Sequence, residues 1–215
     1  MRYWTQGNHA EVDMHVSEVV RCETFLCQDV RPECYIVPEI EVQPEQVRVV
    51  LVSEAAPADL KDYYYAVDEP LFAQTTVQAF QDAGAQVASM RDVLGLGVYL
   101  TTAVKCGKTG YAIAPATILE CSFLLEKEMD LFPNVRAYLL MGDVAIRAVN
   151  AIAKRARQPR VIPAGSTYKI RGGEFAFRGA RAFPSYLQAG PSFFIEKSKR
   201  KMIAEDIAAA LAIAR

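Results

Sequence analysis

The sequence predicts an α/β fold with a central sheet of four parallel strands. Three observations support this prediction. Short runs of β-branched and other apolar residues recur along the chain, as is typical of strands buried on both faces. Glycine and proline bound these runs. Longer stretches with apolar residues at helical spacing separate them, which is the pattern of successive strand–helix–strand units.

Four segments are the expected strands: 47–52, 98–104, 135–141 and 175–183. The first is short and β-branched, and the second is entered through Gly95 and Gly97. The third ends at Gly142, and Gly179 interrupts the fourth. Such runs, bounded by turn residues, are typical of βαβ units.

Four helices are expected between and after these strands: 76–83, 117–132, 143–156 and about 195–214. In the second, four apolar residues share one stripe: Ile118, Cys121, Leu125 and Met129. Gly84 is suited to end the first helix, and Asp143 is suited to cap the third. The sequence contains no internal repeat, so we expect one domain over 1–215 with an irregular or helical region at 1–46.

Composition limits the classes of partner. The 215 residues are 52% hydrophobic, enough to bury one core, and the net charge of −1 means that any nucleic-acid contact must come from a local patch. No apolar run reaches the roughly 18 residues of a membrane span, so no membrane association is expected. Residues 1–18 lack the form of a signal peptide, which predicts a cytoplasmic protein. In that reducing compartment the five cysteines indicate metal binding or simple burial rather than disulfides.

Functional residues are expected where the parallel strands end, because ligands of open parallel sheets bind beyond the carboxyl ends of the strands. Four segments follow the expected strands: 53–57, 105–108, 142–143 and 183–186. These segments are therefore expected to meet around one cleft.

Five short motifs occur in order along this part of the chain. They are Ser53-Glu54-Ala55-Ala56-Pro57-Ala58, Thr101-Thr102-Ala103-Val104-Lys105-Cys106, Glu120-Cys121-Ser122-Phe123-Leu124, Met141-Gly142-Asp143-Val144-Ala145 and Phe183-Pro184-Ser185-Tyr186-Leu187. Their order and content resemble the uracil-DNA glycosylase superfamily, most closely its iron-sulfur branch, family 4. The resemblance runs from about Val47 to the end of the chain. It implies a three-layer α/β/α fold with a central four-stranded parallel sheet.

The resemblance implies a DNA glycosylase that removes uracil or another deaminated base by hydrolysing the N-glycosidic bond. Such cleavage passes through an oxocarbenium-like state, which a carboxylate stabilises while it orients water. Glu54 is the candidate for this catalytic role, and its alternative role is a cap or a salt-bridge partner at the strand exit. Asp59 and Asp68 are expected to be solvated loop residues.

A flipped base needs an aromatic or apolar wall, for which Phe72 and Tyr65 are the candidates. The complete set of implied base-binding residues is Ser53, Ala55, Tyr65, Phe72, Thr102 and Phe183. Where the family has an asparagine this chain has Thr102, whose single hydroxyl cannot read a base edge with two bonds. Where the family has a histidine, Phe183 cannot donate a hydrogen bond to the leaving base. Specificity is therefore expected to be changed or relaxed.

DNA contacts are expected from Lys105, Lys108, Ser185, Tyr186 and Leu187. Leu187 is the candidate wedge that fills the gap left by a flipped nucleotide, and its alternative is an ordinary exposed loop tip. A basic cluster opens the last helix at Lys197, Lys199, Arg200 and Lys201. This cluster is either a phosphate contact or a solvated charge run.

The cysteines carry a separate expectation. Cys106 and Cys121 fall where the family holds two ligands of a [4Fe–4S] cluster, and Cys22 and Cys27 are the candidates for the other two. Cys34 is the possible replacement for either of the last two. Zinc binding and plain burial are the alternatives. No nucleotide cofactor is expected, and His9 and His15 are expected at the surface.

Two main hypotheses follow. The first is an active DNA glycosylase that acts on single- or double-stranded DNA as a monomer. The second is a catalytically degenerate protein on the same fold that binds nucleic acid or a nucleotide. A small-molecule hydrolase on this fold is a third and broader possibility.

Overall fold

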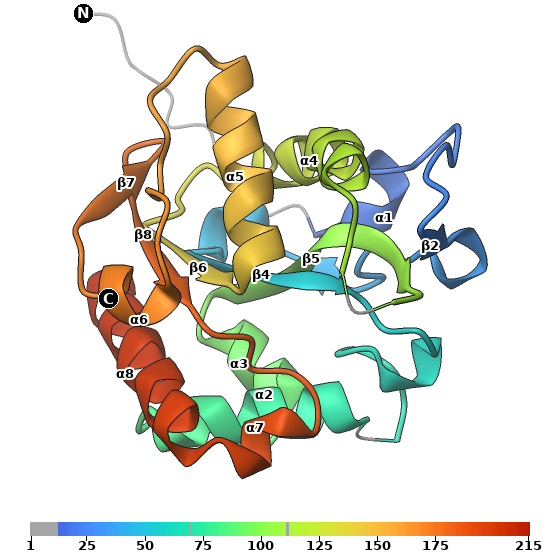
Figure 1. Ribbon diagram of the computed structural model, residues 1–215. Helices are drawn as coiled ribbons and strands as arrows, with labels where there is room; N and C mark the ends of the chain where they lie inside the picture. Colours follow the sequence, from blue (N-terminus) through green and yellow to red (C-terminus); the bar gives the residue numbers. More distant parts are fainter. Residues whose placement is uncertain (1–12, 69, 111) are drawn as a thin grey trace, which may run out of the picture.

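The computed structural model describes residues 13–68, 70–110 and 112–215 (Figure 1). In this part of the chain, a mixed six-stranded sheet lies between two layers of helices, which confirms the predicted α/β class. The strand order is β2 (Val30–Arg31), β5 (Val98–Lys108), β4 (Val49–Ala56), β6 (Ala137–Met141), β8 (Ala180–Ser185) and β7 (Phe175–Phe177).

The four inner strands are parallel, as expected. β4 pairs with β5 on one side and with β6 on the other, and β6 pairs with β8. The two outer strands, β2 and β7, are antiparallel to their neighbours and only two and three residues long. Short edge strands leave few unpaired backbone groups at the rims of the sheet.

Each face of the sheet is covered by its own helices (Figure 1). α4 (Pro115–Met129) and α5 (Asp143–Arg155) cover the face on which Val50 and Val52 of β4 lie. α2 (Leu71–Asp82), α3 (Met90–Gly95) and α8 (Lys197–Ala214) cover the face of Val49 and Leu51. All four of these β4 side chains are 0% exposed, which explains why the run 49–52 is continuously apolar.

The N-terminal region consists of short elements. β1 (Met14–His15) pairs with β3 (Glu41–Val42), and α1 (Val16–Val19) follows β1. In the described part of the chain, 3₁₀ turns lie at Pro32–Cys34, Pro44–Gln46 and Leu60–Asp62. Two short helices, α6 (Thr167–Ile170) and α7 (Ser192–Ile195), lie outside this region, in the last quarter of the chain. His15 is exposed, as expected, and His9 lies outside the described residues.

The prediction of one strand over 175–183 is wrong. Arg178 and Gly179 both have positive φ, 52° and 79°, and form the two-residue turn of a hairpin between β7 and β8. β8 therefore begins at Ala180 and carries Phe183 and Ser185 within the strand, paired with β6.

Two other strands run past their expected ends. β4 continues through Glu54 to Ala56, and β5 continues through Lys105 to Lys108. A register shift between Ala55 and Ala56 keeps the two strands paired. Among the described residues, no helix combines the length and apolarity that a bilayer crossing requires.

Candidate functional site

A cleft of about 460 Å³ opens at the carboxyl ends of β4 and β5. Most of its lining comes from residues 53–59, from Phe72 in the first turn of α2, from Lys108 at the end of β5, and from Leu187 and Ala189 after β8. The cleft thus lies at the sheet edge where the sequence predicted it.

Glu54 extends into this cleft from β4, with 20% of its side chain exposed. Its Oε2 atom lies 3.6 Å from Nζ of Lys108. On the other side the carboxylate contacts Gly142, the residue that precedes α5. The carboxylate is therefore held between an ammonium group and the positive end of a helix dipole.

Phe72 forms the aromatic wall of the cleft. Its ring packs on Tyr64 with the centroids 5.5 Å apart. Tyr65, the other candidate, does not line the cleft because its hydroxyl is bonded to the backbone of Leu100 in β5. Of the two predicted wall residues, the structure brings only Phe72 to the site.

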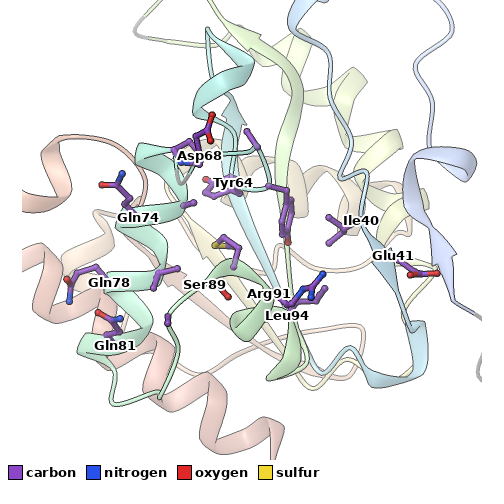
Figure 2. Close-up of a pocket in the computed structure, with 17 residues that line it drawn as sticks. Ile40, Glu41, Tyr64, Asp68, Gln74, Gln78, Gln81, Ser89, Arg91 and Leu94 are labelled. Carbon is purple, nitrogen blue, oxygen red and sulfur yellow. The ribbon is translucent and has the colours of Figure 1, made fainter.

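Tyr65 instead lines a larger cavity of about 750 Å³, which is bounded by α2, α3 and the segment around Tyr64 (Figure 2). Gln74, Gln78 and Gln81 form a row along α2 on one side of it, and Ile40 and Glu41 lie on the opposite side. Asp68 is exposed at its edge. The cavity has its own charged lining residues, Glu41, Asp68 and Arg91, but the cleft is the candidate for chemistry because it holds Glu54 beside Lys108 at the ends of the parallel strands.

Thr102 and Phe183 do not line the cleft, contrary to the sequence-based expectation. Thr102 is 0% exposed and faces Ser53 across the β4–β5 register. Phe183 is 7% exposed and packs in the apolar cluster beside Leu139 of β6. Thr102 was expected on the pocket floor near the end of the strand 98–104, and Phe183 was expected in the loop 183–186. β5 and β8 continue past these two residues, and both side chains are buried in the sheet.

Two of the predicted DNA contacts are also buried. The Lys105 ammonium group lies inside the protein, where it pairs with Glu128 of α4 and donates to Thr101 Oγ1 at 2.6 Å. Ser185 is 0% exposed and donates to Oδ2 of Asp206 at 2.6 Å. Both side chains are committed within the fold, so neither is available to a phosphate.

The remaining predicted DNA contacts lie at or beside the cleft. Leu187 and Lys108 line it, and Tyr186 precedes Leu187 in the same loop. The Tyr186 ring lies 5.5 Å from Nζ of Lys199, so the start of α8 adjoins this loop. Within the basic cluster, Lys199 pairs with Glu196 and Arg200 pairs with Asp82, whereas Lys197 and Lys201 are exposed.

Sequence reasoning missed four residues that line the cleft: Arg31, Asp62, Gly110 and Ala189. Arg31 reaches the cleft from the distant edge strand β2, which no local pattern predicts.

Four cysteines gather on the far side of β5. Cys106 and Cys121 are buried, and the backbone N–H of Lys105 donates to Cys121 Sγ at 3.5 Å. Cys22 and Cys27 line a cavity of about 240 Å³ together with Cys121. Burial, with a smaller contribution from the neighbouring cysteine thiols, raises the pKa of the Cys106 thiol to about 12.

The cysteines Cys22, Cys27, Cys106 and Cys121 offer thiol ligands, and the cavity beside them also has Glu23 and Glu120 in its lining. Among the described residues, no three or more histidine, cysteine or acidic side chains are close enough together to hold one metal ion. Thiolates alone, converging from different elements, are the ligand type of a [4Fe–4S] cluster. Cys34 differs from the other four because its thiol donates to the carbonyl oxygen of Ala58 at 3.3 Å.

The fold and the site together define an α/β protein with a ligand cleft beyond the ends of a parallel sheet and a partly exposed carboxylate inside that cleft. Over 77 residues the chain is 32% identical to a type-5 uracil-DNA glycosylase of Thermus thermophilus. The match covers 36% of this chain and 35% of that protein, so the chain spans about a third of the length of the curated relative it matches. No protein-family model matches the chain.

This similarity supports the resemblance to the uracil-DNA glycosylase superfamily. The relative is named as type 5, whereas the sequence motifs indicated family 4 as the nearest branch. The branch therefore stays a prediction.

Proposed function

We propose that the protein is a DNA glycosylase that removes uracil or another deaminated base by hydrolysing the N-glycosidic bond. The observation that carries the proposal is the position of Glu54, whose carboxylate reaches into a cleft walled by Phe72 and Leu187. The similarity to a uracil-DNA glycosylase gives independent support.

In this mechanism a flipped base enters the cleft and stacks on Phe72, while Leu187 fills the space left in the DNA. A water molecule attacks the anomeric carbon and the glycosidic bond breaks toward the base, which leaves with the bonding electrons. Glu54 takes the proton of the water and stabilises the positive charge on the sugar. The Lys108 ammonium group, 3.6 Å from this carboxylate, forms an ion pair with it inside the cleft.

At two positions where the family has residues that hydrogen-bond the leaving base, this chain has Thr102 and Phe183. Neither Thr102 nor Phe183 lines the cleft, and Phe183 has no donor in any case. Loss of one hydrogen-bond donor to a developing anion costs about 10²- to 10³-fold in rate. We therefore propose a slower enzyme than one with the family's complete set, or one directed to bases that leave more readily.

We also propose that Cys22, Cys27, Cys106 and Cys121 hold a [4Fe–4S] cluster. The donors are thiols only, and the interaction of Cys106 with the other cysteines supports the assignment. Such a cluster would link the N-terminal segment to β5 and α4. Iron and sulfide in a 4:4 ratio per chain in anaerobically purified protein is the expected result. Zinc in their place would favour the alternative site, and a metal-free protein would contradict both.

A base-release assay tests the catalytic proposal. Oligonucleotides carrying uracil, hypoxanthine or xanthine, single- and double-stranded, are incubated with the protein and abasic sites are cleaved by alkali. We expect release by the wild type and a loss of about 10²- to 10⁴-fold in Glu54→Gln, the range for a general base. Asp62→Asn is the matched control, because it neutralises another carboxylate that lines the same cleft.

The outcomes separate the hypotheses. Release that disappears in Glu54→Gln and persists in Asp62→Asn supports the glycosylase. Retained DNA binding without release of any base supports a nucleic-acid-binding protein on this fold. Absence of both would leave a small-molecule hydrolase as the remaining hypothesis.

A further inference from the structure

The lining of the cleft contains more acidic than basic side chains. The acidic residues are Glu54, Asp59 and Asp62, and the basic residues are Arg31 and Lys108. A flipped nucleotide stays joined to its strand by a phosphate on each side, and each of these phosphates is negatively charged. A strand that enters this cleft therefore needs a cation that is available to a phosphate.

The two basic side chains of the cleft differ in what they bind. Lys108 pairs with the Glu54 carboxylate at 3.6 Å. Arg31 is exposed and forms no ion pair within the part of the chain that the structure describes. Its guanidinium group makes one long hydrogen bond, from Nη1 to the carbonyl oxygen of Ala58 at 3.4 Å. Most of its N–H donors are therefore open to a ligand.

The fold holds Arg31 at the cleft from two sides. Its backbone pairs with Gly107 where β2 runs beside β5. Gly107 permits this close approach, because a Cβ atom added there would lie 2.9 Å from the carbonyl oxygen of Pro57 and 3.5 Å from Cβ of Arg31. The bond to Ala58 joins the guanidinium group to the loop that follows β4. Part of the freedom of this side chain is thus already lost before a ligand binds.

We propose that Arg31 binds a backbone phosphate beside the flipped nucleotide. A guanidinium group can bind two phosphate oxygens with parallel N–H···O bonds, which an ammonium group cannot do in the same geometry. Such a contact positions the strand and does not depend on the base. The inference rests on the proposed function in taking DNA as the ligand of the cleft. It adds the residue that distinguishes a nucleotide within a strand from a free nucleoside.

The alternative role of Arg31 is structural. The Cys34 thiol donates to the same Ala58 oxygen at 3.3 Å, so in this role the two side chains only hold the loop after β4 in place. A loop held in this way affects every ligand of the cleft to the same extent. A phosphate contact depends instead on the charge of one particular phosphate, which gives the two roles different consequences.

The test combines changes in the protein with changes in the DNA. Arg31→Gln and Arg31→Lys are compared with the wild type and with Arg136→Gln. The last variant removes an exposed arginine just before β6, at the edge of the sheet opposite the cleft. Fluorescence anisotropy measures binding to a single-stranded oligonucleotide with a central 2′-fluoro-2′-deoxyuridine. This nucleotide resists base release, because fluorine destabilises the oxocarbenium-like state.

Further oligonucleotides carry a neutral methylphosphonate in place of one phosphate, before or after this nucleotide. We expect Arg31→Gln to bind the unmodified oligonucleotide on the order of 10-fold more weakly than the wild type does. The slope of its log affinity against log salt concentration should be smaller by about 0.7, the value for one phosphate of a single strand. One methylphosphonate should weaken binding by the wild type similarly and leave Arg31→Gln nearly unaffected.

The other variants separate charge from geometry. Arg31→Lys should recover part of the lost affinity, because it keeps the charge without the planar group. Arg136→Gln should bind like the wild type. If each methylphosphonate weakens the wild type and Arg31→Gln equally, the phosphate contact is overturned and the structural role remains. A wild type that does not bind these oligonucleotides also overturns it.

The phosphate contact and the proposed activity can fail separately. If the wild type releases a base but no methylphosphonate distinguishes it from Arg31→Gln, the contact is overturned and the glycosylase stands. If one methylphosphonate does distinguish the two proteins but no base is released, the contact stands and the glycosylase is overturned.

Discussion

The carboxylate of Glu54 and the backbone of Gly142 are in direct contact, with no room for a side chain at position 142. A Cβ atom added there would lie 2.6 Å from Oε1 and 2.9 Å from Cγ of Glu54. Gly142 also has φ of +95°, a conformation that other residues rarely adopt. The end of β6 therefore fixes the position of the proposed catalytic group on β4.

Gly142→Ala is expected to displace Glu54 and to lower base release nearly as much as Glu54→Gln does. The strained backbone should reduce the free energy of unfolding by about 1–3 kcal/mol. The control is Gly84→Ala, at a glycine with φ of +86° where an added Cβ meets no atom within 4 Å. Equal base release by the two alanine variants, measured on the same oligonucleotide, would show that contact with Gly142 does not position Glu54.

Lys105 and Glu128 form a buried ion pair that joins β5 to α4, and Tyr99 donates to the same carboxylate at 2.6 Å. Lys105→Met is expected to destabilise the protein by about 3–5 kcal/mol, because it leaves the Glu128 charge buried without its partner. Urea unfolding measures the loss, and the double variant Lys105→Met/Glu128→Gln should recover most of it. A double variant as unstable as the single one would contradict this account.

The same pair explains one limit of the sequence analysis. A lysine after an apolar run indicates the end of a strand, and only the tertiary structure brings Glu128, 23 residues later, to neutralise it. Likewise, Gly179 indicated an interruption, but the positive φ of Arg178 that makes a hairpin has no distinctive residue type. The presence of the strands could be predicted from local apolar runs. The positions of their ends could not, because they depend on residues that are distant in the sequence.

The candidate site could be predicted to a similar extent. Glu54, Phe72, Lys108 and Leu187 lie around one cleft because parallel strands must end at one edge, which is a property of topology. Arg31 could not be found this way, because it reaches the cleft from the edge strand β2, and no local pattern indicates that this strand lies beside the end of β5.

Asp29 stabilises the start of α4 from the N-terminal region. Its carboxylate accepts from the backbone N–H of Ala114 at 2.6 Å and from the Thr117 hydroxyl, and these bonds lower its pKa below the usual 3.8. A lowered folded-state pKa gives stability that is complete above the unfolded value and is lost as the pH falls through the folded value.

Asp29→Asn is therefore expected to cost about 1 kcal/mol at pH 7, as other lost helix caps do, and much less near pH 2. Urea unfolding of the wild type and the variant at both pH values measures the difference. Asp62→Asn, at an exposed carboxylate, should show little effect at either pH. A gap between wild type and Asp29→Asn that is the same at both pH values would rule out the ionised carboxylate as its source.

We predict that Leu187 distinguishes duplex from single-stranded substrates, since only a duplex leaves a gap in the stack when a base is extruded. Leu187→Ala is expected to lower kcat/KM for uracil release from duplex DNA on the order of 10-fold, which corresponds to about 1.4 kcal/mol of lost contact. Release from single strands should change little. Ile195→Ala is the control, because Ile195 is 78% exposed and does not line the cleft. An equal loss on both substrates would mean that Leu187 supports the cleft wall and does not act as a wedge in DNA.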